Sequence, residues 1–348
     1  MSSTTLRVGV VGTTPYAESH IVRINAHPRA TVVAVAGRDR PKANAVATRN
    51  GIAAVFDGYE RMLDSKLLDA LVIVAPDDLH EAIAVRALQA GLHVLCEKPL
   101  AASSEAARRM ARAAAASGRV NMSYFALRTS GHHRYLRDLL AGGAIGRVQT
   151  AAFSLTHGFF RTAQYNWRFD AALGGGVIAD LGCYLFDLAR WYVGEVRAVA
   201  VHGASLVERP HPDGTPYAPA HDSAVGLLAF SNGAHATFEA NVLSHVGPGK
   251  QQNTVHLQGE HGRLELQHTF DGAHIRLLTD GDGTWREQTL PRGFDAPSGD
   301  AEFLDAILAD RPLRPNFTDG WRVQQVVSAA ETAAQKRIWT AVEREDGP

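Results

Sequence analysis

Residues 6–37 read LRVGVVGTTPYAESHIVRINAHPRATVVAVAG, and this stretch decides the class of fold. Two short apolar runs rich in β-branched residues, 6–11 and 31–36, flank a helical stretch at 17–27. Runs of this length and composition are typical of strands that are buried on both faces of a parallel sheet. Two parallel strands joined through a helix form a right-handed βαβ unit. The stretch therefore predicts an α/β fold.

The same alternation of strands and helices continues to about residue 125. Further strands are predicted at residues 71–75 and 93–96, and further helices at residues 41–50, 79–90 and 103–117. A series of βαβ units gives a doubly wound parallel sheet, whose ligands bind beyond the carboxyl ends of its strands. Residues 1–125 are therefore predicted to form a dinucleotide-binding domain.

After residue 125 the chain becomes rich in strands of another kind. Residues 223–231 and 234–242 flank Asn232-Gly233, a hairpin signal in which both turn residues should take positive φ. More strands are predicted at 253–258, 263–268, 274–279 and 285–290, with helices at 133–140, 301–309 and 320–337 and a surface loop at 208–222. Residues 126–348 are thus predicted to form a substrate-binding and oligomerisation domain of α+β class. Its large, mostly antiparallel, open sheet turns one face to water or to a second subunit.

The overall composition limits the class of partner. At 348 residues the chain is longer than one hydrophobic core usually organises, and its net charge of −1 favours neither nucleic acid nor a membrane surface. No run approaches the roughly 18 apolar residues of a spanning helix, and the first residues lack the pattern of a signal peptide. Cys96 and Cys183 lie far apart in apolar settings, which favours reduced thiols and a cytoplasmic protein. The 16 histidines show no metal-binding spacing, so no metal is expected.

The turn after the first strand stands where a dinucleotide fingerprint belongs. Gly12 and Ala17 fill its first and third small-residue positions, and Thr13 lies between them in the turn. Such a turn brings backbone N–H groups and a helix N-terminus to a pyrophosphate. Thr14 replaces the second glycine, so its side chain should crowd the pyrophosphate unless the loop shifts or the hydroxyl donates to a phosphate oxygen. A strand-to-helix turn that binds nothing is the alternative.

The second strand ends at Gly37 and Arg38, where dinucleotide-binding domains carry an acid for the ribose 2′-hydroxyl. Gly37 removes that acid, and the guanidinium of Arg38 can pair with a 2′-phosphate. The two residues therefore predict NADP in preference to NAD as the cofactor. The alternative is that Arg38 is only an exposed residue on the rim.

Two later strands are also followed by polar residues. The strand that ends at Ala75 runs into Pro76, Asp77, Asp78 and His80, and the strand at 93–96 runs into Glu97 and Lys98. A lysine between an acid and a proline at the end of a strand suits a site, since its ammonium must stay hydrated or paired. If a substrate carbon gives hydride to a nicotinamide, the ammonium stabilises the developing alkoxide and lowers the pKa of a nearby tyrosine. An ordinary rim lysine is the alternative.

Residues 174–192 read GGGVIADLGCYLFDLARWY and predict a helix. A stripe of leucines anchors this helix, while Asp180, Tyr184 and Asp187, spaced i, i+4 and i+7, share a polar face. Taken alone, the stretch favours a buried core helix whose tyrosine is hydrogen-bonded. Considered together with Lys98, it is expected to supply the substrate side of a site.

Three stretches together resemble the Gfo/Idh/MocA family of nicotinamide-dependent sugar and polyol oxidoreductases. They are VAPDDLH at 74–80, GLHVLCEKPL at 91–100 and WRFDAALGGGVIADLGCYLFDLARWYVG at 167–194, and the resemblance runs from residue 8 to about 342. It implies a Rossmann domain followed by a domain on an open antiparallel sheet that commonly makes dimer or tetramer contacts. It also implies NADP or NAD as cofactor, a sugar or cyclic polyol as substrate, and a homodimer or homotetramer.

The resemblance also assigns roles to single residues. Lys98 matches the catalytic lysine, Asp180 matches the site aspartate, and Tyr184 stands where most members carry a histidine within D-x-G-x-H-x-x-D. The residues expected at the cofactor are Gly12, Thr13, Thr14, Gly37, Arg38, Ala75, Pro76, His80, Glu97, Lys98 and Arg168. Those expected at the substrate are Lys98, Arg128, Trp167, Asp180 and Tyr184.

The leading hypothesis is an NADP-dependent oxidoreductase that interconverts a secondary alcohol and a ketone. In it Tyr184 transfers the proton, Lys98 lowers the pKa of Tyr184 and stabilises the oxyanion, and Asp180 orients the substrate or the lysine. One alternative is a regulator that binds the cofactor without catalysis, which the altered turn at Thr14 favours. Another is an enzyme that keeps its cofactor bound and cycles it between two substrates. The loop residues that could line the pocket are His157, Phe159, Arg161 and Tyr165.

Overall fold

The computed structural model describes residues 5–247, 250–294, 297–343 and 347. These residues form two compact units. The first contains residues 5–126, 297–322 and 347, and the second contains the described residues of 127–294 and 323–343. The division at residue 125 that the sequence suggests places 297–322 in the second domain, whereas in the structure this segment joins the first unit. Helix α9 (Phe317–Lys336) begins in the first unit and ends in the second.

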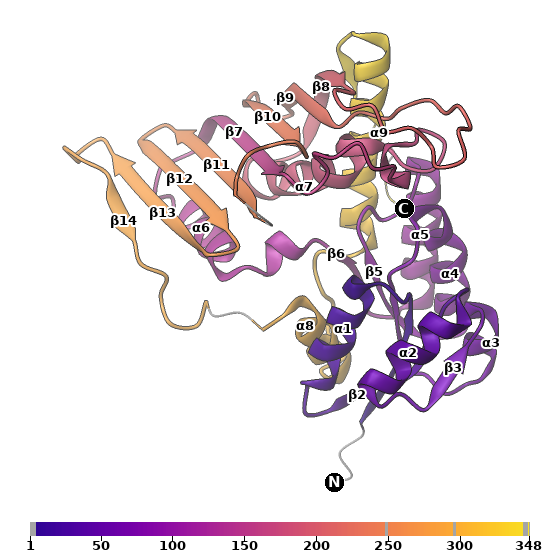
Figure 1. Ribbon diagram of the computed structural model, residues 1–348. Coiled ribbons are helices and arrows are strands. Elements are labelled where there is room, and N and C mark those ends of the chain that lie inside the picture. The colour runs from indigo at the N-terminus through magenta and orange to yellow at the C-terminus, as the bar shows by residue number, and fades with distance from the viewer. Residues whose placement is uncertain (1–4, 248–249, 295–296, 344–346, 348) are drawn as a thin grey trace. The chain divides into compact units, whose positions relative to one another are not determined.

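The first unit is an alternation of strands and helices. It contains β1 (Leu6–Val11), α1 (Pro15–Asn25), β2 (Ala30–Ala36), α2 (Arg40–Asn50), β3 (Ala54–Phe56), α3 (Tyr59–Asp64), β4 (Ala70–Ile73), α4 (Asp77–Gln89), β5 (His93–Glu97), α5 (Ser104–Ser117), β6 (Asn121–Tyr124) and α8 (Gly299–Leu308). Within the described ranges its strand order is β3-β2-β1-β4-β5-β6, and neighbouring strands run parallel. Figure 1 labels β2, β3, β5 and β6 of this sheet and the helices of the same unit. This is the doubly wound order of dinucleotide-binding domains. The prediction of a doubly wound parallel sheet is therefore confirmed.

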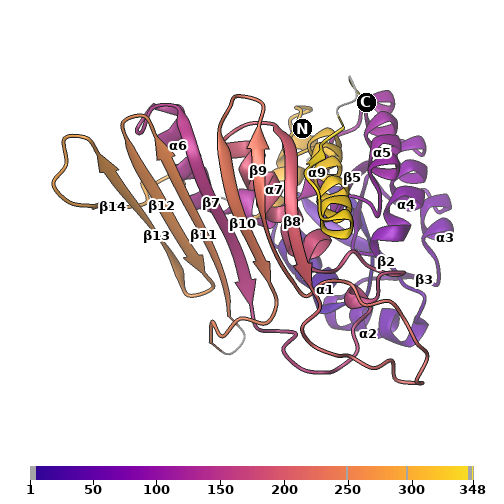
Figure 2. The same ribbon diagram turned by 90° about the horizontal axis from the view of Figure 1, so that it is seen from above.

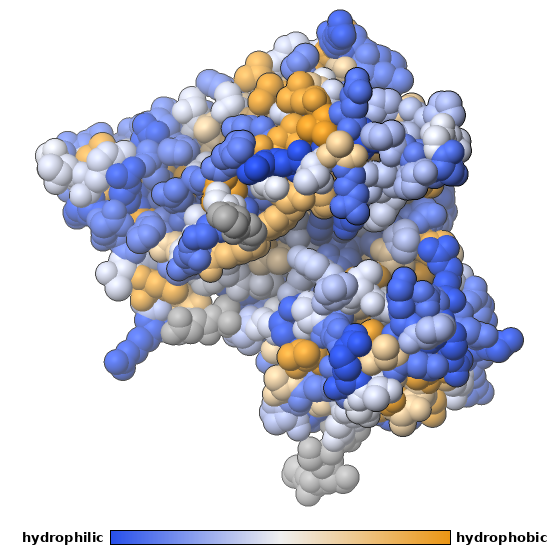
Figure 3. Space-filling view, in the orientation of Figure 1, coloured by the Kyte–Doolittle hydropathy of each residue, from blue (hydrophilic) through white to orange (hydrophobic). Residues whose placement is uncertain are grey.

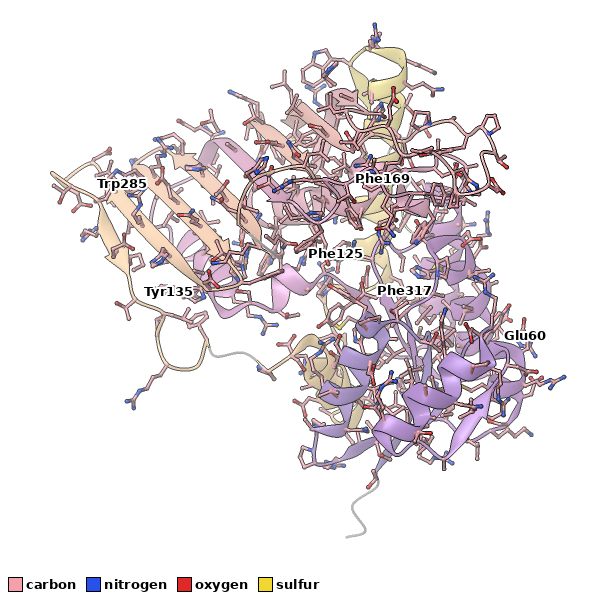
Figure 4. All side chains as sticks on the ribbon, in the orientation of Figure 1. Glu60, Phe125, Tyr135, Phe169, Trp285 and Phe317 are labelled. Atoms are coloured by element: carbon pink, nitrogen blue, oxygen red, sulfur yellow. The ribbon has the colours of Figure 1, made fainter. Side chains whose placement is uncertain are left out.

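Two apolar cores fill the two faces of this sheet. On one face, residues such as Ile73 pack against α3, α4 and α5 and against Phe317 and Trp321 of α9. On the other face, residues such as Val8 pack against α1, α2 and α8. Phe317, which Figure 4 labels, is fully buried. The segment 297–322 thus contributes to the core on each face of the sheet, which explains why it belongs to the first unit.

The second unit is built on a larger sheet, whose strands lie side by side in Figure 2. It contains α6 (Gly131–Ala141), β7 (Val148–His157), η2 (Trp167–Phe169), η3 (Ile178–Gly182), α7 (Cys183–Tyr192), β8 (Val196–Ala204), β9 (Ser223–Phe230), β10 (His235–Asn241), β11 (Gln251–Gly259), β12 (Gly262–Thr269), β13 (Gly272–Thr279), β14 (Arg286–Gln288) and β15 (Thr340–Ala341). In the described part of the chain the order is β14-β13-β12-β11-β7-β10-β9-β8-β15. Strands β7 and β10 run parallel, and the other neighbours run antiparallel. The prediction of a large, mostly antiparallel sheet is therefore confirmed.

The predicted hairpin forms between β9 and β10, but its turn differs from the expected one. Gly233 takes a φ of +90°, whereas Asn232 is not among the residues of positive φ. The side chain of Asn232 instead accepts a hydrogen bond from the backbone N–H of Ala234 at 3.1 Å. Because β9 ends at Phe230 and β10 begins at His235, the connection is longer than a two-residue turn. The expectation that both turn residues take positive φ is therefore wrong.

The two faces of the second sheet differ in their surroundings. The apolar face predicted for the hairpin is buried, as shown by Ala236, Phe238, Ala240 and Val242. The ring of Phe238 contacts that of Phe186 on α7, with 5.1 Å between centroids. On the other face, Val225 and Leu227 of β9 are 47% and 45% exposed. Figure 3 shows hydrophobic residues gathered over the β8 and β9 end of this unit. The sheet therefore carries an exposed apolar area on β9.

No helix in the described part of the chain is both long enough and apolar enough to cross a lipid bilayer. Helix α9 has 20 residues, but polar and charged side chains such as Arg322, Gln325 and Glu331 interrupt its apolar residues. Its composition suits packing within a folded domain.

Candidate functional site

The predicted phosphate turn joins β1 to α1, and Gly12 and Thr14 determine its backbone geometry. Gly12 takes a φ of +136°, and a Cβ there would lie 2.4 Å from the carbonyl oxygen of Val74, so only glycine fits. Thr14 is the N-cap residue of α1, and its Oγ1 accepts a hydrogen bond from the backbone N–H of Ala17 at 3.3 Å. The hydroxyl hydrogen of Thr14 can still donate to a phosphate oxygen. Thr14 thus caps α1 in a way that is compatible with an anion at the helix N-terminus.

Gly37, Arg38 and Asp39 follow the carboxyl end of β2 and lead into α2. A Cβ at Gly37 would lie 2.5 Å from Cγ2 of Thr13, so an acidic side chain at this position would clash. Asp39 caps α2 by accepting a hydrogen bond from the backbone N–H of Lys42 at 3.1 Å, and it also pairs with Nζ of Lys42. Arg38 and Lys42 are both exposed. The structure therefore leaves no room for an acidic side chain at position 37, and an exposed guanidinium follows it at Arg38.

The carboxyl ends of β4 and β5 are joined by His80, which lies on α4. Nε2 of His80 lies 2.9 Å from the carbonyl oxygen of Ala75, and Nδ1 lies 3.1 Å from that of Pro99. The ring of His80 thus contacts the backbone after β4 and the backbone after β5. Because His80 is only 1% exposed, it offers little surface to a ligand. Pro76 lies before α4 as its exposed N-cap residue, and burial raises the pKa of Asp77 beside it. The structure therefore brings Ala75, Pro76 and His80 together at one edge of the sheet.

Lys98 follows directly after β5, and its backbone is fixed by the residue before it. Oε2 of Glu97 accepts a hydrogen bond from the backbone N–H of Lys98 at 3.1 Å, and Oε1 lies 3.0 Å from Nε2 of His20. Nδ1 of His20 lies 2.5 Å from Oδ1 of Asp300, whose other oxygen accepts from Nε of Arg23. His20 and Asp300 are fully buried. The predicted residues Glu97 and Lys98 are therefore supported by a buried charged network.

The charges in this network balance. Burial lowers the pKa of His20, but the hydrogen bonds to Asp300 and Glu97 outweigh that effect and raise the pKa to about 9. Burial raises the pKa of Asp300, but His20 and Arg23 outweigh it and hold this pKa below its usual range. Two carboxylates thus face two cations, and each removed partner would leave a charge buried without compensation. The network ties α1, the end of β5 and α8 together.

In the second unit, the short helical turn η2 places two predicted residues beside Asp180. Nε of Arg168 lies 3.7 Å from Oδ2 of Asp180, and the guanidinium carbon lies 4.6 Å from the ring centroid of Trp167. The side chains of Arg168 and Asp180 are 37% and 20% exposed. At this distance the two groups form an ion pair without a hydrogen bond. The structure therefore brings Trp167, Arg168 and Asp180 together, with their polar ends partly open to solvent.

Tyr184 lies on the helix that the sequence predicts over 174–192, but this helix changes type along its length. Residues Ile178–Gly182 form the π-helical turn η3, and residues Cys183–Tyr192 continue it as α7. A π turn joins residue i to residue i+5, and such turns are frequent at functional sites. Asp180 lies inside this turn, and Tyr184, which is 8% exposed, follows it. The regular helical spacing expected for these two residues is therefore interrupted between them.

Asp187, the third residue of the predicted polar face, is buried in an ion pair. Nε and Nη2 of Arg128 each donate a hydrogen bond of 2.7 Å to a carboxylate oxygen of Asp187. The two side chains are 10% and 1% exposed, and the guanidinium carbon lies 5.1 Å from the ring centroid of Trp191. A bidentate pair of this kind fixes the chain before α6 to α7. Asp187 thus occupies Nε and Nη2 of Arg128, and contact between Arg128 and the substrate stays a prediction.

Two loops of the second unit are joined through Arg209. Its Nη1 donates to Oδ2 of Asp222 at 2.9 Å, and its Nη2 donates to the carbonyl oxygen of Phe160 at 2.6 Å. Its guanidinium carbon also lies 4.3 Å from the ring centroid of Phe169, which Figure 4 labels. The predicted loop at 208–222 is therefore held at its start by the buried side chain of Arg209. The loop residues suggested for the pocket, His157, Phe159, Arg161 and Tyr165, lie in or next to the loop that Arg209 contacts.

Sequence reasoning missed three members of the network behind Lys98. His20, Arg23 and Asp300 were not expected at the site, and His20 is 280 positions away from Asp300 along the chain. The available local signal was a histidine and an arginine three residues apart on the first helix. Such a pair predicts nothing unless its acidic partners are known, and no spacing in the sequence indicates a partner so remote.

Both units resemble domains of known proteins. A sequence model of an oxidoreductase family with an NAD-binding Rossmann fold matches residues 6–125, and a model of the GFO/IDH/MocA C-terminal domain matches residues 133–265. Levoglucosan dehydrogenase of Pseudarthrobacter phenanthrenivorans is 27% identical over 85% of this chain and 85% of its own. The 1,5-anhydro-D-fructose reductase of Ensifer adhaerens is 30% identical over 67% of this chain and 68% of its own. A solved structure of levoglucosan dehydrogenase in complex with NADH has a TM-score of 0.89 at 23% identity, covering 98% of this chain and 100% of that one, which shows a common fold.

Proposed function

The chain belongs to the Gfo/Idh/MocA family and is an NAD(P)-dependent oxidoreductase, and we propose that it interconverts a secondary alcohol and a ketone on a sugar, a sugar derivative or a cyclic polyol. The observation that carries the proposal is the place of Lys98, directly after β5. That is the edge at which a doubly wound sheet binds its dinucleotide. The class of substrate is supported by two relatives, which are named for levoglucosan and 1,5-anhydro-D-fructose.

In this proposal the protein's own residues handle the proton and the developing charge. The nicotinamide, when bound, supplies the acceptor or the donor of the hydride. Tyr184 takes the proton from the substrate hydroxyl, Lys98 stabilises the oxyanion, and Asp180 orients the substrate or the lysine through hydrogen bonds. Arg168 holds Asp180, with Trp167 beside it as an apolar surface for the sugar ring. The proposal requires Lys98 and Tyr184 to act on the same substrate molecule.

Two substitutions test this division of roles. We expect Lys98→Ala and Tyr184→Phe each to lower kcat by about 10²- to 10⁴-fold, since each removes a group that acts in the transition state. Tyr135→Phe is the control, because it makes the same chemical change on α6, where the ring of Tyr135 packs 5.1 Å from that of Phe294. Nicotinamide absorbance across a panel of sugars and polyols is the measurement.

The outcomes of that experiment separate the alternatives. If each variant kept full turnover on an accepted substrate, the assigned mechanism would be wrong. If the two substitutions together cost no more than the larger single one, Lys98 and Tyr184 act as a unit. If the wild-type protein bound NADP but changed no substrate of the panel, the sugar or polyol class would be wrong.

We also propose NADP as the preferred cofactor, held by Gly12, Thr13 and Thr14 at its pyrophosphate and by Gly37 and Arg38 at its 2′-phosphate. Arg38→Ala should raise the Kd for NADP by about 10-fold or more and leave that for NAD within about 2-fold, since only NADP carries the phosphate. Arg29→Ala is the control, because Arg29 is an exposed arginine just before the start of the same strand. Equilibrium titration of both cofactors into both variants is the measurement. An equal loss for NADP and NAD would contradict the preference.

We assign dinucleotide binding to the first domain, and substrate binding and self-association to the second. A homodimer or homotetramer is supported by the exposed Val225 and Leu227 on β9, which a second copy of the chain would cover. Leu227→Glu should shift the mass measured by light scattering towards the monomer; an unchanged mass would place the interface elsewhere. Cys96 and Cys183 are buried and form no disulfide among the described residues, which supports a cytoplasmic location.

A further inference from the structure

Glu97 stands directly before Lys98, and both of its carboxylate oxygens are engaged. One oxygen accepts the backbone N–H of Lys98 at 3.1 Å, and the other lies 3.0 Å from Nε2 of His20. A carboxylate held at both oxygens cannot turn without breaking a hydrogen bond. The carboxylate of Glu97 therefore joins the main chain at Lys98 to the His20 ring.

The ring of His20 is itself held from its other side. Its Nδ1 lies 2.5 Å from Oδ1 of Asp300 on α8, and the Tyr124 ring meets it at 4.8 Å between centroids with an interplanar angle of 70°. Because both polar partners of the ring are carboxylates, both ring nitrogens must donate, and only the imidazolium has two N–H groups. The raised pKa of about 9 agrees with this geometry. His20 is thus a fixed, doubly donating cation between α8 and the end of β5.

We propose that His20 is a positioning residue for Lys98: its imidazolium holds Glu97, and through Glu97 it holds the Lys98 main chain in the place from which the lysine acts. Asp300 fixes the opposite side of the ring, so a segment from the end of the chain contributes to catalysis without contacting the substrate. Buried charge networks are weak devices for stability, because well-packed apolar residues often serve as well. Orientation of the neighbouring lysine gives this network a use that apolar residues could not supply. The inference rests on the proposed role of Lys98.

Two variants of His20 separate positioning from folding. His20→Gln places its amide N–H₂ near the site of Nε2 and keeps a donor for Glu97, whereas His20→Asn places its amide near the site of Nδ1 and keeps a donor for Asp300 only. Both variants lose the same charge and one hydrogen bond, so their effects on folding are matched. We expect His20→Asn to lower kcat by about 100-fold and His20→Gln by less than about 5-fold. The Kd for NADP should stay within about 2-fold of the wild-type value in both.

Equal losses of kcat in the two variants would overturn the inference, as would losses that fall only on cofactor affinity. Lys98→Ala is measured beside them. If Lys98→Ala keeps its turnover, the proposed function itself fails; if it is inactive while the two His20 variants are equal, only this inference fails. Should circular dichroism show that His20→Asn does not fold, Asp300→Asn replaces it. That variant should lower kcat by about 10-fold at unchanged Kd for NADP, and an unchanged kcat would overturn the inference.

Discussion

His20 in the first unit and His133 in the second are both 0% exposed, yet their surroundings favour opposite protonation states. Burial lowers the pKa of His20, but the hydrogen bonds to Asp300 and Glu97 raise it to about 9. Burial, with His268 and His132 nearby, holds the pKa of His133 well below its usual range. The first ring is therefore charged at neutral pH and the second is neutral.

The difference shows that burial alone does not decide the charge of a histidine. Burial disfavours the cation in both places, and the partners then decide whether that cost is exceeded. The ring of His133 lies 5.4 Å from that of His268, between centroids, and its Nδ1 lies 2.7 Å from the hydroxyl of Tyr192, a neutral group. It follows that the two units should lose stability at opposite ends of the pH range.

Removal of one carboxylate should break the contrast most strongly. Asp300→Ala leaves the buried His20 and the half-buried Arg23 without their shared partner, and we expect the free energy of unfolding to fall by about 3–5 kcal/mol. Urea unfolding followed by circular dichroism is the measurement. The control is Arg61→Ala, which removes an exposed pair with Asp57 whose side chains are 76% and 49% exposed, and which should cost less than about 0.5 kcal/mol. Equal costs for the two variants would mean that the buried network is not held by charge.

A titration above neutral pH should show the contribution of His20 in the wild-type protein. Its pKa rises from 6.5 to about 9 on folding, so the stability that it supplies is fully present below pH 6.5 and is lost as the pH rises through 9. The shift corresponds to about 3 kcal/mol. Between these two pH values the free energy of unfolding of the wild-type protein should fall by about that amount relative to His20→Gln, which cannot titrate there. Parallel curves for the two proteins would show that His20 is neutral in the folded state.

Local pattern was sufficient to predict the two sheets. Short β-branched runs such as residues 31–36 gave the parallel strands, and the alternation at Ala236, Phe238 and Ala240 gave the buried face of the hairpin. The phosphate turn could also be located, because Gly12 stands between a predicted strand and a predicted helix. These signals lie within a few neighbouring residues, where the chain's own geometry determines which face a side chain occupies.

The remaining features depend on contacts that no local pattern contains. The packing of α8 and Phe317 on the first sheet joins residues from the end of the chain to strands near its start. The π turn at Ile178–Gly182 is a change in backbone hydrogen bonding, and the side-chain spacing gave no sign of it. Asp187 had the spacing of a polar face, yet its pairing with Arg128 made it a buried residue. The burial of Asp187 and of Asp300 could be recognised only in the structure, where Arg128 contacts Asp187 and His20 contacts Asp300.

The smallest expected effect concerns His133, at acidic pH. The folded pKa of His133 lies below its ordinary value of 6.5, so its neutral form contributes stability that is present above pH 6.5 and is lost as the pH falls. The hydroxyl of Tyr192 donates to the backbone carbonyl oxygen of His133 at 3.2 Å, so Nδ1–H of the ring donates to that hydroxyl. His133→Asn places an amide N–H₂ near the site of Nδ1 and keeps this donor, but it cannot titrate. Between about pH 6.5 and 5.5, the wild-type protein should lose about 1 kcal/mol relative to this variant in urea unfolding, because the unfolded histidine is already half protonated at pH 6.5. His268 titrates in both proteins, so its contribution cancels in the difference. Parallel curves in this range would mean that folded His133 takes up a proton as readily as the unfolded chain does. Burial would then not lower the pKa of His133, and the difference from His20 would come only from the carboxylates around His20.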